Sequence, residues 1–129
     1  MANQRKVHES KQAPAPIGPY SQAVEVNGMV FCSGQIPLDA GTGQMVGQTV
    51  SEQAEKVMQN ISAVLSSADL TLQNVVKTTI FLTDMNDFAS VNEVYAKHMR
   101  DNKPARSTVA VAALPKAAKV EIEVLAVRG

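Results

Sequence analysis

Several residue types that mark particular classes of protein are scarce in this chain of 129 residues. It has one cysteine, Cys32, and no tryptophan, and only 4% of its residues are aromatic. A single thiol rules out an internal disulfide framework and fits a reducing compartment. Few aromatic side chains leave few surfaces on which nucleic-acid bases could stack.

The chain also lacks an excess of either charge and a long apolar run. Its 12 basic and 12 acidic residues cancel to a formal net charge of +0. A nucleic-acid-binding surface, an acidic tail and a polybasic membrane anchor each need an excess of one sign. No run approaches the roughly 18 apolar residues of a transmembrane helix, and residues 1–10 lack the apolar core of a signal peptide. We therefore expect a soluble cytoplasmic protein, with neither a membrane nor nucleic acid as its partner.

The length of the chain suits one domain that buries about two thirds of its unfolded surface without a disulfide or a metal. We predict a single domain over residues 1–129, with residues 1–12 as a flexible N-terminus. Three prolines and a glycine in the segment 13–20 then predict an extended or turning course over the surface.

The clearest local signal is Asn27-Gly28, which lies between two short apolar runs at 23–26 and 29–33. Both residues tolerate positive φ, so the pattern predicts a β-hairpin. The loop that follows, at 34–44, is rich in turn residues but has no Gly-Lys-Ser/Thr, which makes a phosphate site a weak interpretation. Gly34 directly follows the second strand, where a missing side chain would let a ligand approach the backbone.

A helix of about 17 residues is predicted from Ser51 onward, because apolar residues recur there at three- and four-residue steps. Thr49 with Glu52, or Ser51 itself, is expected to cap its start. A strand rich in β-branched residues follows at 75–83.

A second helix is predicted after that strand. Its cap is expected among three residues: Asp84, Asn86 and Asp87. Its buried side is expected to hold five residues: Phe88, Val91, Tyr95, His98 and Met99. Asn92 lies one position off this apolar stripe, where a polar side chain could line an interface.

The predicted elements follow the order strand pair, helix, strand, helix, strand pair. Two helices for four to six strands fit an α+β domain, with both helices on one face of a largely antiparallel or mixed sheet. The other face of the sheet then lacks cover. A domain this small is expected to bury that face against another subunit, so the pattern itself favours an oligomer.

Two charged residues stand near the start of the last two predicted strands. Arg106 lies in the run 103–114 and Glu121 in the run 120–127, and both runs are rich in small and β-branched residues. A charge buried in a strand without a partner is strongly destabilising, so each must reach solvent, a partner or a functional site. Taken alone, the pair is more typical of a strand-end ion pair or a solvated sheet face than of a catalytic site.

Seven strings of the sequence match one known family in order and approximate spacing. They are Ile17-Gly18-Pro19-Tyr20-Ser21-Gln22-Ala23, Ser33-Gly34-Gln35-Ile36-Pro37, Val76-Lys77-Thr78-Thr79-Ile80-Phe81-Leu82, Asn86-Asp87-Phe88, Pro104-Ala105-Arg106-Ser107, Leu114-Pro115-Lys116 and Val120-Glu121-Ile122-Glu123. On these strings, which span nearly the whole chain after residue 12, the sequence resembles the reactive intermediate deaminase (RidA) family, also called YjgF. The Pro-Ala-Arg-Ser string is the most specific of the seven.

The resemblance implies a chorismate-mutase-like α+β fold, and a homotrimer with three clefts between its subunits. It also implies hydrolysis of the reactive enamines and imines that pyridoxal-phosphate enzymes release, such as 2-aminoacrylate or 2-iminopropanoate, to 2-oxo acids and ammonia. No cofactor is then required, because the substrate arrives already activated. No metal is expected either, since His8, His98 and Cys32 have no metal-ligand spacing.

Roles for individual residues follow from the resemblance as well. Arg106 matches the family's carboxylate-binding arginine, and Glu121 matches the glutamate that contacts a water in the cleft. Four further residues match positions near that pocket: Tyr20, Ser33, Gly34 and Asn92.

The chemistry of these side chains agrees with such roles. A planar guanidinium can donate two parallel hydrogen bonds to the carboxylate of a 2-imino acid and so fix the imine carbon. A carboxylate beside a water could take its proton as it attacks that carbon, and then return a proton to the leaving ammonia. Glu121 is the candidate, and Glu123, on the same strand face, is the fallback, although a solvated or subunit-contact charge is more typical of that position. Tyr20 is expected either to close the cleft or simply to pack against the proline loop, with Ser33 and Asn92 as hydrogen-bonding helpers.

The sequence departs from the family pattern at Thr108, where many members carry cysteine. Thr108 shares a strand face with Arg106, so its hydroxyl or backbone N–H could still contact a ligand. Two other functions stay open. One is a ligand-binding or chaperone-like trimer without turnover. The other is a ribonuclease or translation inhibitor, against which the neutral charge and the few aromatic residues argue.

Overall fold

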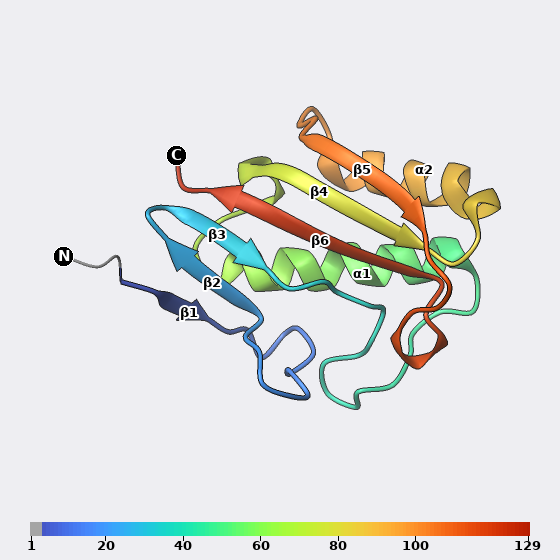
Figure 1. Cartoon of the computed structure of the whole chain (residues 1–129), viewed down its shortest axis with the longest axis horizontal. Coiled ribbons are helices and arrows are strands. Elements are labelled where there is room, and N and C mark those ends of the chain that lie inside the picture. Colours follow the sequence, from blue (N-terminus) through green and yellow to red (C-terminus); the bar gives the residue numbers. More distant parts are fainter. Residues whose placement is uncertain (1–3) are drawn as a thin grey trace.

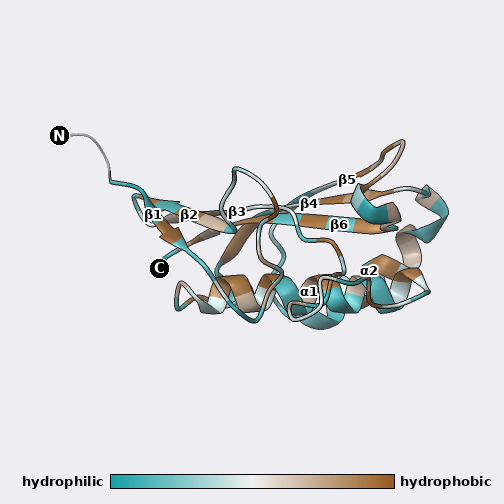
Figure 2. Cartoon of the chain, turned by 90° about the horizontal axis from the view of Figure 1, so that it is seen from below, coloured by the Kyte–Doolittle hydropathy of each residue, from teal (hydrophilic) through white to brown (hydrophobic). Residues whose placement is uncertain are grey.

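Within residues 4–129, which the computed structural model describes, a six-stranded sheet forms one layer and two α-helices form the other (Figure 1). The elements along the chain are β1 (Lys6–His8), β2 (Ala23–Val26), β3 (Met29–Cys32), α1 (Val50–Ser66), β4 (Val75–Leu82), α2 (Phe88–Met99), β5 (Ala105–Ala110) and β6 (Val120–Val127). Seen edge-on, both helices lie on the same side of the sheet (Figure 2). The predicted α+β fold is confirmed.

The strands lie in the order β1-β2-β3-β6-β4-β5. All neighbours are antiparallel except β4 and β5, which run parallel. A parallel pair needs a crossover connection, and α2 provides it here. The last strand, β6, enters between β3 and β4 and so joins the N-terminal hairpin to the rest of the sheet. The outer edge of β5 is unpaired within the described chain.

The hairpin predicted at Asn27-Gly28 is confirmed. Val26 of β2 pairs with Met29 of β3, so these two residues alone make the turn. Asn27 has φ 52 and Gly28 has φ 79. Positive φ at both central residues is the conformation that matches the twist of the flanking strands, and it explains why this dipeptide is found here.

The first predicted helix is confirmed in position and in length. It spans the 17 residues Val50–Ser66. The hydroxyl of Thr49 accepts a hydrogen bond from the backbone N–H of Glu52 at 3.2 Å, and the Glu52 carboxylate accepts one from the N–H of Thr49 at 3.1 Å. This reciprocal capping box satisfies two backbone donors that would otherwise lack partners.

The start of the second helix differs from the prediction in detail. Asp84 accepts a hydrogen bond from the backbone N–H of Asn86 at 2.9 Å, so it caps the 3-10 turn Met85–Asp87 that leads into α2. Asp87, directly before α2, makes no capping bond with its side chain. The prediction located the cap in the right segment, but the short turn that Asp84 caps was not foreseen.

Three of the five residues assigned to the buried side of α2 are buried, whereas Phe88 and His98 are only partly buried. Val91, Tyr95 and Met99 are buried, but the side chain of His98 remains 20% exposed. Its Nε2 lies 2.9 Å from a carboxylate oxygen of Glu55 on α1. A polar partner at the edge between the helices therefore holds His98 outside the core.

The core lies between the sheet and the helices. Alternate residues of β6 face the helices and are buried: Val120, Ile122, Val124 and Ala126. The helix α1 contributes a matching stripe: Ala54, Val57, Met58, Ile61, Val64 and Leu65. Removing these apolar surfaces from water is the main force that holds the two layers together.

Within the described chain, no helix covers the opposite face of the sheet (Figure 2). Phe31 of β3, which is 47% exposed, pairs there with Leu125 of β6. Val109 of β5 is 42% exposed and pairs with Phe81 of β4. This open sheet face therefore carries apolar side chains at several strands, as the sequence pattern predicted.

No helix in the described range 4–129 is both long and apolar enough to cross a membrane.

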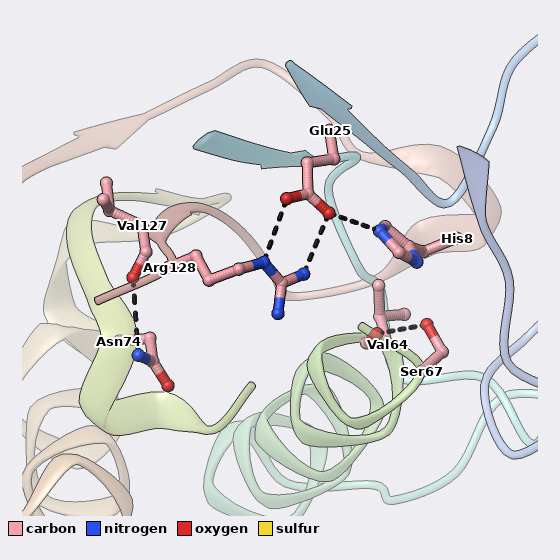
Figure 3. Close-up of polar contacts among 7 residues, drawn as sticks. All are labelled: His8, Glu25, Val64, Ser67, Asn74, Val127 and Arg128. Carbon is pink, nitrogen blue, oxygen red and sulfur yellow. Dashed lines mark hydrogen bonds and ion pairs between the residues drawn. The ribbon is translucent and has the colours of Figure 1, made fainter. Parts of the chain in front are cut away.

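Part of the stretch 1–12, expected to be flexible, is ordered. Residues 6–8 form β1, which pairs with β2, whereas residues 1–3 lie outside the described range. His8 lies 2.7 Å from the carboxylate of Glu25, and Arg128 donates to both oxygens of that carboxylate at 2.9 and 3.0 Å (Figure 3). The Arg128 hydrogen bonds, followed by the one to His8, lower the pKa of Glu25 to about 2. Glu25 thus stays charged at neutral pH and ties both ends of the chain to the hairpin.

The strand expected in the run 103–114 is shorter in the structure. It ends at Ala110, and the chain then turns through Pro115–Ala117 towards β6. Its only neighbour, β4, ends at Leu82, whose carbonyl accepts a last hydrogen bond from the N–H of Val111 at 2.7 Å. The apolar residues beyond that point have no strand to pair with, which the sequence pattern of one strand does not reveal.

Candidate active site

A cavity of about 480 Å³ lies where the loop after β3 meets the start of β6. Four of the predicted site residues line it: Tyr20, Ser33, Gly34 and Glu121. The rest of its lining comes from the proline-rich segment, the loop after Gly34 and the turn before β6: Pro14, Ala15, Ile17, Gln22, Gln35, Ile36, Leu38, Pro115 and Lys116. Segments far apart in sequence therefore form one pocket around a single carboxylate.

Glu121 is the only acidic side chain in the lining of this cavity. Its side chain lies on the open sheet face because its neighbours Val120 and Ile122 point into the core. Burial is the main cause that raises the pKa of the Glu121 carboxyl above its ordinary value of 4.5, and the nearby charge of Glu123 adds to it. A carboxylate with a raised pKa is a stronger base than a fully solvated one, which suits proton transfer.

Gly34 leaves room for the Glu121 carboxylate. A Cβ atom added at Gly34 would overlap Oε2 of Glu121 and lie only 3.0 Å from its Cδ atom. The sequence suggested that the missing side chain admits a ligand. The structure shows that the space is taken by the candidate base, so a side chain at position 34 would exclude the carboxylate from the place where it lies.

The wall of the pocket next to Tyr20 is held by a residue that the sequence did not single out. Gln22 is 2% exposed, and its amide nitrogen donates to the carbonyls of Ser10, Ala13 and Pro14 at 3.1, 3.4 and 2.9 Å. Its amide oxygen accepts from the N–H of Ser10 at 2.6 Å. One buried side chain thus fastens the proline-rich segment to β2, and nothing in the local sequence pattern distinguishes it.

Tyr20 and Ser33 occupy different environments in this pocket. The Tyr20 side chain is 54% exposed at the rim. The hydroxyl of Ser33 donates to the carbonyl of Ser21 at 2.6 Å. Ser33 therefore holds the segment that carries Tyr20, and only its remaining acceptor capacity is available to a ligand.

Arg106 and Asn92 lie together, but in a different part of the molecule. Arg106 Nη1 donates to the side-chain oxygen of Asn92, on α2, at 2.7 Å. Both residues line a second cavity of about 480 Å³ at the β5 edge, whose other lining residues are Tyr95, Ala96, Met99, Arg100, Asn102, Lys103 and Pro104. The contact shows that the Arg106 side chain lies on the helix side of the sheet.

Thr108 shares the Arg106 side of β5, as predicted. In the parallel register, Arg106 lies opposite Thr78 and Thr108 opposite Ile80, and both of these partners are buried. The Oγ1 atom of Thr108 is buried and has no hydrogen-bond partner among the described residues. A buried hydroxyl without a partner is destabilising, and nothing else in the described chain offsets this cost.

Arg106 and Glu121 of one chain therefore do not meet. Glu121 lies opposite Phe81 of β4, whereas Arg106 lies opposite Thr78, on the other side of that strand and on the other sheet face. Strand geometry separates them by about 10 Å along the strands and about 10 Å across them. The strand-end ion pair that the sequence left open is not formed, and Arg106 and Glu121 of one chain line two separate cavities.

Comparison with known proteins agrees with this architecture. A model of the family described as endoribonuclease L-PSP matches residues 10–128. The chain is 55% identical to protein DfrA of Myxococcus xanthus over 95% of each chain. It is 48% identical to the mouse 2-iminobutanoate/2-iminopropanoate deaminase, with 97% of this chain and 93% of the mouse protein covered.

A solved structure shows the same fold. The crystal structure of RidA from the Antarctic bacterium Psychrobacter sp. PAMC 21119 has 41% sequence identity and a TM-score of 0.91, over 95% of this chain and 99% of that chain. The six-stranded sheet with two helices on one face, and the match to RidA over nearly the whole of both chains, define a Rid-type α+β domain. The chain belongs to the RidA (YjgF) family, as its sequence motifs predicted.

Proposed function

We propose that this protein hydrolyses imines of 2-oxo acids, and their enamine tautomers, to the 2-oxo acid and ammonia. The observation that carries the proposal is the half-buried Glu121 carboxylate, with its raised pKa, in a cavity bounded by Gly34. The mammalian relatives named 2-iminobutanoate/2-iminopropanoate deaminase support the same substrate class. No cofactor takes part in this scheme, because the carbon–nitrogen double bond is already reactive.

Glu121 acts as the base and then as the acid. The imine reacts with a proton already on its nitrogen. The Glu121 carboxylate takes a proton from a water while the water oxygen bonds to the imine carbon and the carbon–nitrogen π bond breaks, which gives a neutral carbinolamine. Glu121 then returns its proton to the nitrogen, and the carbon–nitrogen bond breaks. The hydroxyl gives its proton to the departing ammonia as the carbonyl forms, so one water is consumed for each ammonium released.

Arg106 binds the carboxylate of the substrate. A guanidinium offers planar paired donors, and only Nη1 of Arg106 donates to a side chain of the described protein, that of Asn92. Its other N–H groups are therefore available to a ligand. Asn92 helps by holding the guanidinium, and the unpartnered hydroxyl of Thr108 lies on the same side of β5.

We call the cavity residues around Arg106 and those around Glu121 the two half-sites. A complete site requires that they come from different subunits. The unpaired edge of β5 and the apolar open sheet face support assembly through this side of the molecule. In such an assembly the Arg106 half-site of one chain can face the Glu121 half-site of its neighbour. The homotrimer implied by the family resemblance is part of this proposal.

The mass in solution tests the assembly. We expect light scattering to give three times the 13.8 kDa chain mass. Phe31→Glu, which puts a charge on the open sheet face, is expected to yield monomers because an interface cannot bury an unpaired charge. Met85→Glu, an equally exposed position in the turn before α2, should leave the mass unchanged. A monomer for the unmodified chain would contradict the proposed assembly.

Activity is tested by coupling to an enzyme that releases the substrate. In a threonine or serine dehydratase reaction, added protein is expected to speed the appearance of the 2-oxo acid, because hydrolysis of the free imine no longer depends on solvent alone. The control is the same amount of heat-denatured protein. If several amino-acid-derived imines show no acceleration although the trimer forms, the protein is a ligand-binding trimer without turnover.

Gly34→Ala tests the placement of the base. The added Cβ overlaps the Glu121 carboxylate and must displace it, and a shift of about 1 Å can lower a rate by roughly 100-fold. Gly41→Ala, in the same loop, has only the end of the Asp39 side chain at 3.3 Å and should keep the rate. Equal rates for both variants would show that the position of Glu121 does not limit the reaction.

Ribonuclease activity, suggested by the description of the family model, has little support from the side chains. The two histidines, which could serve as acid and base, lie outside the Glu121 cavity. His8 contacts Glu25 and His98 contacts Glu55. With a net charge of +0, the chain also has no overall excess of positive charge to favour binding to RNA.

A further inference from the structure

The guanidinium of Arg106 lies over two aromatic rings of α2. Its Cζ atom is 5.1 Å from the ring centroid of Tyr95 and 5.4 Å from that of Phe88. Both distances fall within the range of a cation–π contact, to which Arg contributes more often than Lys. An exposed arginine on an edge strand would otherwise sample many rotamers, so these contacts restrict where its charge can lie.

Tyr95 differs from Phe88 in how firmly it is fixed. The Tyr95 side chain is 6% exposed, and its hydroxyl lies 2.9 Å from the hydroxyl of Thr78 on β4, which is 1% exposed. Phe88, at the first turn of α2, is only partly buried. A buried hydrogen bond between the two layers thus sets the position of one ring, and Arg106 lies directly opposite Thr78 in the sheet register.

We propose that Tyr95 is a positioning residue that holds the Arg106 guanidinium for an incoming carboxylate, with Phe88 as a second ring and Thr78 as the anchor of the Tyr95 hydroxyl. The identity of the carboxylate as that of an imino acid rests on the proposed function. The contacts that hold the Arg106 guanidinium do not depend on the proposed function, because they are made entirely by side chains of this chain. Asn92 accepts one N–H, the rings limit the movement of the guanidinium, and the remaining donors stay free.

The arrangement reduces the entropy lost when a ligand binds. An arginine that is already held in place loses less side-chain freedom on forming two hydrogen bonds than a freely moving one does. Lysine could not replace it, since an ammonium group lacks the planar paired donors. Tyr95 therefore acts through Arg106 rather than by contact with the substrate.

The test measures Arg106 directly, by NMR of the full-length protein in the assembly that it forms in solution, and pyruvate binding by calorimetry. In the unmodified protein we expect the Arg106 Hε resonance to be shifted by the ring currents, relative to that of the exposed Arg5. Tyr95→Leu should move this resonance towards that of Arg5 and raise the Kd for pyruvate about three- to tenfold. Tyr95→Phe keeps the ring and should keep most of the shift.

A double-mutant cycle separates positioning from a structural role. In an Arg106→Ala background, Tyr95→Leu should cause no further loss of pyruvate binding, because Tyr95 acts only through Arg106. An equal loss in both backgrounds, or an Arg106 resonance that Tyr95→Leu leaves unchanged, would overturn the proposal. If Tyr95→Leu does not fold, Phe88→Leu, at a partly exposed position, provides the same comparison for the second ring.

The NMR result for Arg106 does not depend on the proposed function. If the protein neither binds pyruvate nor hydrolyses imines, the deaminase proposal fails. The ring-current shift of Arg106 and its loss in the Tyr95 variant still decide whether Tyr95 holds the guanidinium.

Discussion

Glu121→Gln is expected to lower kcat for imine hydrolysis by about 100- to 10,000-fold, the usual contribution of a general acid–base group. Glutamine keeps the shape of the side chain but cannot take a proton from water. Because the ionised carboxylate is partly desolvated, its removal should leave the thermal midpoint at neutral pH unchanged or higher. Stopped assays with an imine-generating enzyme give the rate, and circular dichroism gives the midpoint. Retention of the full rate would remove Glu121 from the mechanism.

The pH profile gives a second measurement of the same group. The proposed reaction requires an ionised Glu121, so kcat/KM should fall as the pH falls through its pKa, which lies above the ordinary 4.5. Glu123→Gln removes the neighbouring negative charge that helps to raise this pKa. The acidic limb should therefore move to lower pH in that variant while the rate at neutral pH is kept. This variant is also the matched control for Glu121→Gln, since Glu123 is exposed on the same strand face. If the acidic limb of the profile does not move in Glu123→Gln, a group other than Glu121 controls it.

Arg106→Ala is expected to lower kcat/KM by about 100-fold or more, because both the charge-assisted hydrogen bonds and the orientation of the substrate are lost. Arg106→Lys should recover only part of this loss, since lysine restores the charge but not the planar fork. The proposed trimer should persist in both variants, which light scattering can test. Lys97→Gln removes one positive charge on the outer side of α2 and should keep the activity.

The two Arg106 variants distinguish charge from geometry. Full recovery with lysine would mean that Arg106 acts through the electric field alone. Full activity of Arg106→Ala would mean that the carboxylate is bound elsewhere. Loss of the trimer in Arg106→Ala would indicate that the arginine has a structural role at the subunit contact.

Local features of the fold could be predicted because their causes are local. The turn at Asn27-Gly28 depends on backbone freedom at two adjacent residues, and the capping box of α1 on Thr49 and Glu52. The helix stripes follow from a period of 3.6 residues. His98 was misplaced because the stripe alone does not reveal Glu55, its partner on another helix.

The candidate site could be predicted only in part. The motifs identified Arg106 and Glu121, and a pocket around Tyr20, Ser33 and Gly34 is present. The contacts that Gln22 and Tyr95 make beside the two cavities were not predicted, because a buried glutamine or a core tyrosine has no distinctive sequence pattern. Their roles depend on contacts with residues from other elements, namely Pro14 for Gln22 and Arg106 for Tyr95.

The sequence by itself determined the class of fold and the positions of the helices and the hairpin, and it supplied the candidate side chains for the proposed chemistry. Only the tertiary structure decided how those side chains lie relative to one another. The insertion of β6 between β3 and β4 places Glu121 beside Gly34, and the parallel register of β5 places Arg106 against Tyr95 on the other sheet face. Strand order and register depend on the packing of the whole core and on hydrogen bonds between distant segments, so no local pattern encodes them.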